Sequence, residues 1–286
     1  MSSFSVRHAF AAATVVLIAS IALTRVDWPT ISHAVLRASA PLLLATMVVT
    51  FASTALKSVR WWIFLRSRTQ LRFSFVLRLT TASTGMNALL VANAGDIMRV
   101  EVAAKRAKVG RRVILRSLVC DKVVEVLAFA TFAALTIALA DTPWLPRPAI
   151  VIGAASVVLF FLAWLASNKA KELRGKAGAT AYALSLLSWL TQIVTYSLAA
   201  RAVGLTLPLS ATMATLVAVN LGGVLRLTPG NIGVYQAMYA LALTPFGVPS
   251  SAAIGAAVLT QSAQIMSGAI AGAIATIRLS SFERSA

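Results

Sequence analysis

Long apolar runs recur along this chain and limit what it can fold into. Examples are residues 9–24, 149–167 and 252–277. Each is long enough, or nearly so, to cross a hydrocarbon layer of about 30 Å as an α-helix. Charged residues make up 12% of the 286-residue chain, against about 25% in soluble domains. We therefore predict an all-α, polytopic membrane helix bundle that forms one integral membrane domain over residues 1–286.

The positive charge of the chain fits a membrane protein better than a nucleic-acid-binding one. The formal net charge is +18, and membrane proteins gather Lys and Arg on cytoplasmic loops, near anionic headgroups. We expect membrane lipids as partners and no nucleic acid. A single cysteine, Cys120, excludes an internal disulfide and a thiolate cluster, while His8 and His33 form no metal set. We expect no metal and no cofactor.

The basic residues also predict the topology. Five of them lie between residues 57 and 72, at the end of a predicted helix, which is a cytoplasmic signature. The first apolar run resembles a signal peptide, but no small-x-small site is well placed after it, so we expect it to be retained. We predict six full spans, with both termini on the cytoplasmic side of a bacterial inner membrane, at about 8–24, 41–65, 112–140, 149–167, 179–203 and 251–277.

Two further segments read as broken helical hairpins rather than as spans. Residues 73–110 contain polar groups, and seven basic residues between 93 and 116 would face outside if this segment crossed the membrane. The break is expected near residues 93–95. Residues 209–247 contain Pro-Gly-Asn-Ile-Gly, which cannot continue a helix, and the helix that follows is too short to span. We predict two re-entrant hairpins that enter from opposite faces. Irregular backbone at membrane depth survives only when it lines a cavity or is buried in protein.

Half of the eight acidic residues lie between Gly85 and Glu125. Asp121 and Glu125 are four residues apart on one helical face, with Lys122 beside them. The apolar run that follows is too short to fill the hydrocarbon layer, so Glu125 and Lys122 should lie inside the membrane. Two interpretations stay open: a buried ion pair that clamps this helix to the hairpin, with Arg99 or Arg60 as partner, or a direct role in a substrate path.

Other candidate residues of the first half also have two interpretations. Asp96 could cap the helix after the hairpin break, or contact substrate. Arg99 lies one turn into that helix, where it could donate to a phosphate as a fork. Lys57 and Arg60 could reach the cytoplasmic headgroups without any substrate role. Two amides of the broken hairpin complete the candidate substrate-binding residues of this half: Asn87 and Asn93.

The second hairpin supplies the remaining candidates. Arg226 is either an intramembrane anion contact or an anchor at the interface. After the break a helix restarts, and its free amides would suit a phosphate; alternatively the turn needs glycine only for close packing. The candidate substrate-binding residues here are Arg226, Pro229, Gly230, Asn231, Gly233, Tyr235 and Gln236.

Three motifs follow one another along the chain: N-A-L-L-V-A-N-A-G-D-I-M-R at 87–99, D-K-V-V-E at 121–125 and T-P-G-N-I-G-V-Y-Q at 228–236. In this order and spacing they resemble the lysylphosphatidylglycerol synthase transmembrane-region family of flippase-like membrane proteins, over about residues 40–278. That family includes the membrane domain of the multiple peptide resistance factor, taken to move aminoacylated phosphatidylglycerol between leaflets. It also includes relatives linked to hopanoid, glycolipid or polyprenyl-phosphate pathways.

The chain departs from the family pattern at three places. Gly95-Asp96 stands where Gly-Glu is common, and Asp121-Lys122 with Glu125 replaces Glu-Arg with Asp, so charge types are kept. Gln236 stands where the family often has Glu, which puts proton coupling in doubt. The chain also lacks the family's soluble aminoacyl-transferase domain, so we expect no synthesis of lysyl-lipid by that route.

The resemblance and the residues together predict a transporter of an anionic phospholipid or polyprenyl-phosphate lipid between leaflets, through a polar intramembrane cavity. The chain has no nucleophile elbow, zinc-protease motif, P-loop or Asp-rich metal motif, so we expect no catalytic residue and no enzyme activity. The alternative is a membrane enzyme, or an accessory subunit of one, that acts on a lipid-linked substrate. A second copy of the chain or a lipid-synthesis enzyme is the candidate protein partner.

Overall fold

The computed structural model describes residues 36–89, 94–139, 175–224 and 229–283, with a few isolated residues elsewhere. The described part is helical and contains no strand. The chain order of its elements is α3 (Ala40–Leu65), α4 (Phe73–Leu89), α5 (Ala94–Ala107), α6 (Arg111–Leu139), α8 (Lys176–Ala202), α9 (Leu209–Gly223), η2 (Pro229–Asn231), α10 (Val234–Leu243), η3 (Thr244–Phe246) and α11 (Ser250–Glu283).

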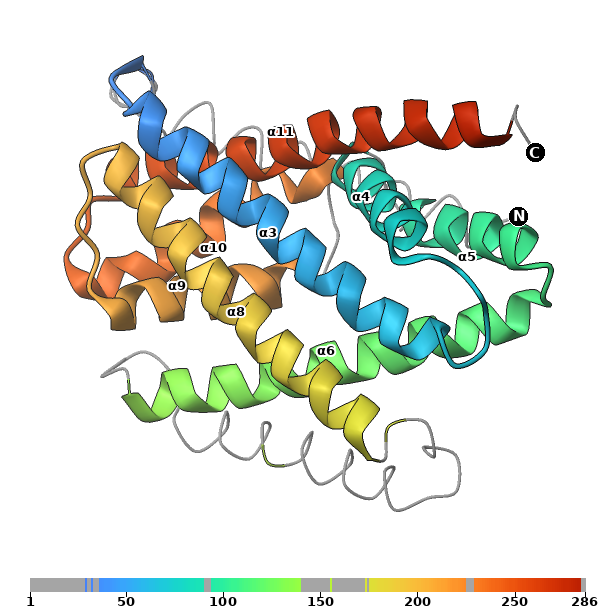
Figure 1. Ribbon diagram of the computed structural model, residues 1–286. Helices are drawn as coiled ribbons and strands as arrows, with labels where there is room; N and C mark the ends of the chain where they lie inside the picture. The colour runs from blue at the N-terminus through green and yellow to red at the C-terminus, as the bar shows by residue number, and fades with distance from the viewer. Residues whose placement is uncertain are drawn as a thin grey trace, which may run out of the picture.

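The antiparallel helices α3 and α8 form the middle of the bundle. They lie side by side and cross obliquely in front of α6, which runs along the bottom of Figure 1, while α11 runs along the top. The backbone N–H of Ser39, just before α3, donates to the Ala202 carbonyl at the end of α8 (2.9 Å). Midway, the Ser53 and Ser188 hydroxyls share a buried hydrogen bond of 3.0 Å. Small polar residues thus let two apolar helices approach closely.

Helices α4 and α5 form the first hairpin, and the structure ends α4 at Leu89 and starts α5 at Ala94. Residues 90–93, and with them part of the predicted break at 93–95, lie outside the described residues. The Asn87 Oδ1 atom accepts a hydrogen bond of 2.9 Å from the backbone N–H of Gly95 in the first turn of α5. A Cβ atom at Gly95 would clash with the Ser83 carbonyl. Glycine is needed here because α5 returns directly against α4.

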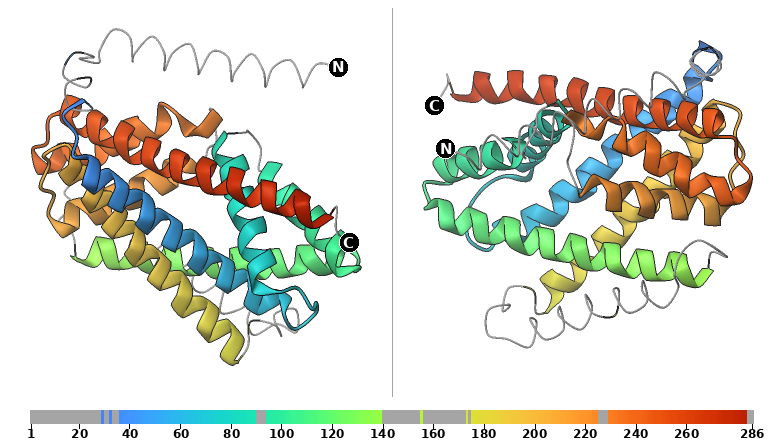
Figure 2. Two further views of the ribbon diagram at one scale, coloured as in Figure 1. Left: turned by 45° about the horizontal axis from the view of Figure 1, so that its top comes forward. Right: turned by 180° about the vertical axis from the view of Figure 1, so that it is seen from behind.

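Helix α11 packs along α4 through glycines on both helices. A Cβ atom on Gly85 would lie 2.6 Å from the carbonyl oxygen of Gly268, and 3.4 Å from the Cα of Gly272. Real Cβ atoms do not come so close to a backbone oxygen, so residue 85 must be small for the helices to touch. The last helix of the chain is in this way fixed to the first hairpin, as both views of Figure 2 show.

Helices α9 and α10 form the second hairpin, at the opposite end of the bundle from α4 and α5 (Figure 1). The turn between them uses left-handed backbone at Gly230 (φ 60°), Asn231 (φ 56°) and Gly233 (φ 89°). Glycine adopts such angles without strain. At 15 and 10 residues, α9 and α10 are about 22 Å and 15 Å long, too short to cross about 30 Å of hydrocarbon. The turn η2 touches α4, so the two hairpins meet.

Three of the described helices are long and apolar enough to span a membrane: α3, α8 and the Ser250–Thr276 part of α11. All three were predicted as spans from the sequence. The predicted spans 8–24 and 149–167, and the candidates Asn93 and Arg226, lie outside the described residues. Helix α6 has 29 residues, about 44 Å, with its charged residues in the first half. Helix α11 continues to Glu283, six residues past the predicted end.

Candidate functional site

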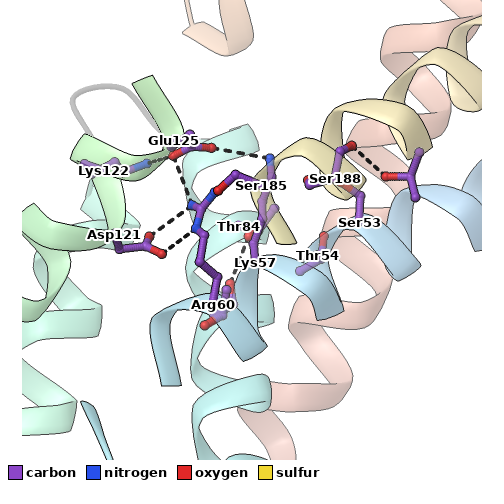
Figure 3. Close-up of polar contacts among 12 residues, drawn as sticks. Ser53, Thr54, Lys57, Arg60, Thr84, Asp121, Lys122, Glu125, Ser185 and Ser188 are labelled. Carbon is purple, nitrogen blue, oxygen red and sulfur yellow. Dashed lines mark hydrogen bonds and ion pairs between the residues drawn. The ribbon is translucent and has the colours of Figure 1, made fainter. Parts of the chain in front are cut away.

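The centre of the candidate site is a buried ion pair between Arg60 of α3 and Asp121 of α6 (Figure 3). The guanidinium binds the carboxylate as a fork, with Nε donating to Oδ1 at 2.7 Å and Nη2 donating to Oδ2 at 3.2 Å. The third guanidinium nitrogen, Nη1, donates to the Ser185 hydroxyl of α8 at 2.9 Å. Arg60 is 2% exposed, so it does not reach out to the headgroups. A fork of this kind fixes three helices in one geometry.

Glu125, one turn after Asp121, gathers three cations. Its Oε2 atom accepts a hydrogen bond from the Lys122 ammonium at 3.1 Å and lies 3.4 Å from Nη2 of Arg60. Its Oε1 atom lies 3.8 Å from the ammonium of Lys57. Figure 3 shows the Glu125 carboxylate between these side chains. Glu125 is 23% exposed and Lys122 and Lys57 more so, so this side of the cluster is the open one.

Arg99 of α5 approaches the same centre from the hairpin. Its Nη2 atom lies 3.9 Å from Oδ2 of Asp121, and its Nη1 atom lies 3.7 Å from Oδ1 of Asp96. The guanidinium carbon lies 3.9 Å from the centre of the Trp61 ring, a cation–π contact. Its Nε and Nη2 atoms are buried and make no hydrogen bond to any described residue. Two strong donors of a buried cation are therefore unused, which costs a few kcal/mol.

The cluster as a whole carries more positive than negative charge. Four cations (Lys57, Arg60, Arg99 and Lys122) surround three carboxylates (Asp96, Asp121 and Glu125). With all groups ionised, the net charge is +1. Every carboxylate has a cation within 4 Å, whereas Arg99 keeps unused donors. Such an arrangement has capacity for one further anion.

Two candidates of the first hairpin have local structural partners. Asn87 holds the start of α5, as described above, and does not join the ion cluster. Asp96 lies in the first turn of α5 rather than at its N-cap, where its carboxylate favours the positive end of the helix. Its Oδ1 atom also accepts from the Ser83 hydroxyl at 3.5 Å. The sequence left capping and substrate contact open for Asp96, and the structure adds the ion pair with Arg99.

Side chains close the second hairpin turn by a chain of hydrogen bonds. The backbone N–H of Gly233 donates to Oε1 of Gln236 (2.7 Å), whose Nε2 donates to Oε1 of Gln261 on α11 (2.7 Å). Nε2 of Gln261 then donates to the Gly230 carbonyl at 2.6 Å. The expectation that the first amides of α10 are free is therefore wrong for Gly233, because the Gln236 side chain occupies that donor.

Asn231 and Tyr235 lie beside this closed turn. Nδ2 of Asn231 donates to the Gly223 carbonyl at 3.3 Å, while its Oδ1 is buried and makes no hydrogen bond to a described residue. Tyr235 is buried against Tyr196 and Tyr239, with ring centres 6.3 Å and 6.1 Å away. Pro229 is described by its backbone, in η2. The structure thus gives an ionic cluster at α3, α5 and α6, and an uncharged polar group at the second turn.

Sequence reasoning missed three partners of these residues. Ser185 and Gln261 are uncharged polar residues within long apolar helices, and Trp61 is one of two adjacent tryptophans among the basic residues at the end of α3. Trp61 is in fact fully buried, and its Nε1 donates to the Ser117 hydroxyl at 3.1 Å. A signal was available for Ser185, because Ser188 lies one turn away on the same helix face. Within the described ranges, no group of three or more His, Cys, Asp and Glu side chains could hold a metal.

Comparison with known proteins agrees with this architecture. A family model described as the lysylphosphatidylglycerol synthase TM region matches residues 8–272. No curated protein of known function matches the chain significantly. The matched range includes the ionic cluster, both hairpins, two of the helices that could span a membrane and most of the third. This chain is therefore a membrane protein that belongs to the lysylphosphatidylglycerol synthase transmembrane-region family.

Proposed function

We propose that this protein moves an anionic phospholipid or polyprenyl-phosphate lipid between the leaflets of the bacterial inner membrane. The observation that carries the proposal is Arg99, a buried cation with two unused donor nitrogens in a cluster of net charge +1. A phosphate offers several oxygens that accept charge-assisted hydrogen bonds from such a fork. The family, whose name links it to phospholipid chemistry, supports the same class of substrate.

The topology proposed for transport has six full spans, cytoplasmic termini and two re-entrant hairpins from opposite faces. Two observations support it: α9 and α10 are too short to cross, and η2 of the second hairpin touches α4 of the first. Paired broken helices of this kind hold the binding site in many transporters. The headgroup would move past the meeting point of the hairpins while the tails stay in lipid.

The arrangement of the acids favours transport over catalysis. A general base needs a carboxylate oxygen free to take a proton from the substrate. Both oxygens of Asp121 accept from Arg60, and each oxygen of Glu125 faces a lysine or Arg60. These pairs leave neither carboxylate with an oxygen free of a cationic partner. We propose that the acids keep the cationic side chains in place, and that the cations bind the lipid.

The test is leaflet movement of labelled lipids in proteoliposomes, with Arg99→Gln as the principal variant. Loss of the guanidinium should slow movement of anionic lipids at least about tenfold, the effect of one lost charged hydrogen bond. Arg111→Gln is the matched control, because Arg111 is 74% exposed and pairs with Glu101 outside the cluster. Failure of the folded wild-type protein to move any anionic, zwitterionic or polyprenyl-phosphate lipid would overturn the proposal. Formation of a product in detergent, where leaflets do not exist, would instead support the enzyme.

A further inference from the structure

Trp61 of α3 lies against the guanidinium of Arg99, the cation that we propose binds phosphate. Its side chain is fully buried, and the guanidinium carbon of Arg99 lies 3.9 Å from the centre of its ring. The preceding residue, Arg60, binds Asp121 as a fork. Two adjacent residues of α3 therefore hold the two sides of the cluster: Arg60 holds the acid of α6, and Trp61 holds the arginine of α5.

The two unused donors of Arg99 belong to one edge of its guanidinium. Nε and Nη2 are both buried and have no hydrogen-bond partner among the described residues. Arg60 uses the same pair of atoms to bind both carboxylate oxygens of Asp121, so Arg99 has an equivalent edge that is not in use. A planar edge of this kind matches two oxygens of one phosphate group.

The contacts that hold Arg99 leave this edge unoccupied. Carboxylate oxygens of Asp121 and Asp96 lie 3.9 Å and 3.7 Å from its terminal nitrogens, which is beyond hydrogen-bond distance. The ring face of Trp61 attracts the positive charge through its quadrupole and offers the N–H groups no oxygen acceptor. A carboxylate in the place of the ring would accept those hydrogen bonds and compete with phosphate for them.

The Trp61 ring is in turn fixed by α6 and by the apolar core around it. Its Nε1 atom donates to the Ser117 hydroxyl at 3.1 Å, and this hydroxyl donates to the Ile114 carbonyl at 2.7 Å. The ring belongs to a buried cluster that includes Leu65 and Ile114. The hydrogen bond satisfies the buried indole and sets the orientation of the ring, so the support under Arg99 is rigid.

We propose that Trp61 is a positioning residue, which holds Arg99 so that its Nε–Nη2 edge stays available to two oxygens of one phosphate group. This inference rests on the proposed function and adds a residue to the site. Without the ring, Arg99 would be free to close the gaps of 3.7 and 3.9 Å to Asp96 and Asp121. The protein would then occupy the donors of Arg99, and the affinity of the cluster for an anion would fall.

The experiment is a double-mutant cycle on lipid binding by the full chain in detergent, with labelled phosphatidylglycerol and a labelled polyprenyl phosphate as probes. Trp61→Leu should weaken binding at least about tenfold, as expected for loss of a desolvated cation–π contact. Trp61→Phe keeps a ring face and should lose less affinity. In the Arg99→Gln background, Trp61→Leu should have no further effect, because the side chain that Trp61 positions is gone.

Trp62→Leu is the matched control. Trp62 is the adjacent tryptophan, with the guanidinium carbon of Arg66 5.4 Å from the centre of its ring and its Nε1 donating to the Leu71 carbonyl at 3.0 Å. Arg66 is exposed and lies outside the cluster, so this variant should leave lipid affinity unchanged. Unfolding in detergent checks that each variant is folded. If Trp61→Leu does not fold, Trp61→Phe takes its place in the cycle, with a smaller loss expected and again none in the Arg99→Gln background.

Three results would overturn the inference: binding that Trp61→Leu leaves unchanged, an equal loss of affinity with and without Arg99, or a folded wild type that binds neither lipid. Leaflet movement in proteoliposomes separates the inference from the proposed function. If the cycle is non-additive in binding but no lipid changes leaflet, the transport proposal fails and the role of Trp61 stands. If lipids change leaflet but the effects of Trp61→Leu and Arg99→Gln simply add, the role of Trp61 fails and transport stands.

Discussion

The Arg60–Asp121 pair allows a direct decision between a structural clamp and a transport role. Asp121→Ala would leave Arg60 buried with one of its anchors gone, and would take from Arg99 its second carboxylate. Breaking a buried pair by removing one partner costs about 3–5 kcal/mol. Because Arg60 is 2% exposed and forked to Asp121 at 2.7 and 3.2 Å, the upper part of that range applies.

The double variant Arg60→Leu/Asp121→Leu removes both charges and keeps the net charge of the cluster at +1. Replacing a buried pair by apolar residues is often neutral or stabilising, so the double variant should regain most of the stability that either single variant loses. Unfolding in detergent, followed for wild type, both singles and the double, gives the coupling free energy. The exposed pair Glu101–Arg111 (2.7 Å) supplies the control cycle, whose coupling should be much smaller.

Transport measured on the same four proteins completes the test. If the pair only clamps α3 to α6, the folded double variant should move lipid at the wild-type rate. If the pair also places Arg99 and Glu125 for the headgroup, the double variant should be stable but should move lipid more slowly than the wild type. A coupling free energy no larger than that of Glu101–Arg111 would refute the description of the pair as the centre of the cluster.

Three further outcomes follow from the structure. Gly85→Ala should destabilise the protein by about 1–3 kcal/mol, measured by unfolding in detergent, because its Cβ would lie 2.6 Å from the Gly268 carbonyl; Gly110→Ala, where no atom lies within 4 Å, is the neutral control. Gln261→Leu should leave Gln236 Nε2 and the Gly230 carbonyl without partners, and cost about 1–3 kcal/mol in the same assay. The hydrogen bond from Arg111 lowers the pKa of Glu101, so this pair stabilises the fold above the ordinary carboxyl pKa and loses its contribution as pH falls through the lowered value. Arg111→Gln should abolish that acid-side dependence of stability, and an unchanged pH profile would contradict the assignment.

The sequence predicted the all-helical fold class and the turn at Pro229-Gly230, because both depend on local chemistry. Long apolar runs specify helices in a membrane, and Pro229-Gly230 interrupts one of them. For Asp121 and Glu125 it left two interpretations open, and one of them was a buried ion pair with Arg99 or Arg60. Both arginines in fact approach Asp121.

The side-chain partners in the candidate site depend on contacts between segments that are far apart in the sequence. Local sequence patterns do not specify such contacts. Ser188 marks a polar face beside Ser185, but no local pattern identifies Arg60, 125 residues away, as the partner of Ser185. The partner of Gln236 lies on α11, 25 residues later. The sequence therefore made the Gln236 amide a candidate for ligand binding, whereas in the structure this amide closes a turn. No local pattern around Trp61 indicates that the first hairpin brings Arg99 over its ring.

The division of charge between the two halves follows from the cost of burying ions. A carboxylate in a membrane needs a cation, and in this chain each acid of the cluster has at least one within 4 Å. The excess cation, Arg99, is stabilised by the face of Trp61 and by the start of the first hairpin rather than by a carboxylate fork of its own. A second acid beside it would neutralise the cluster and remove the excess positive charge that we propose binds phosphate. The sequence has no acid from residue 173 to 282, so a cation buried in that half would find no counter-ion there. Both observations follow from one rule: a buried charge is stable only where an opposite charge meets it.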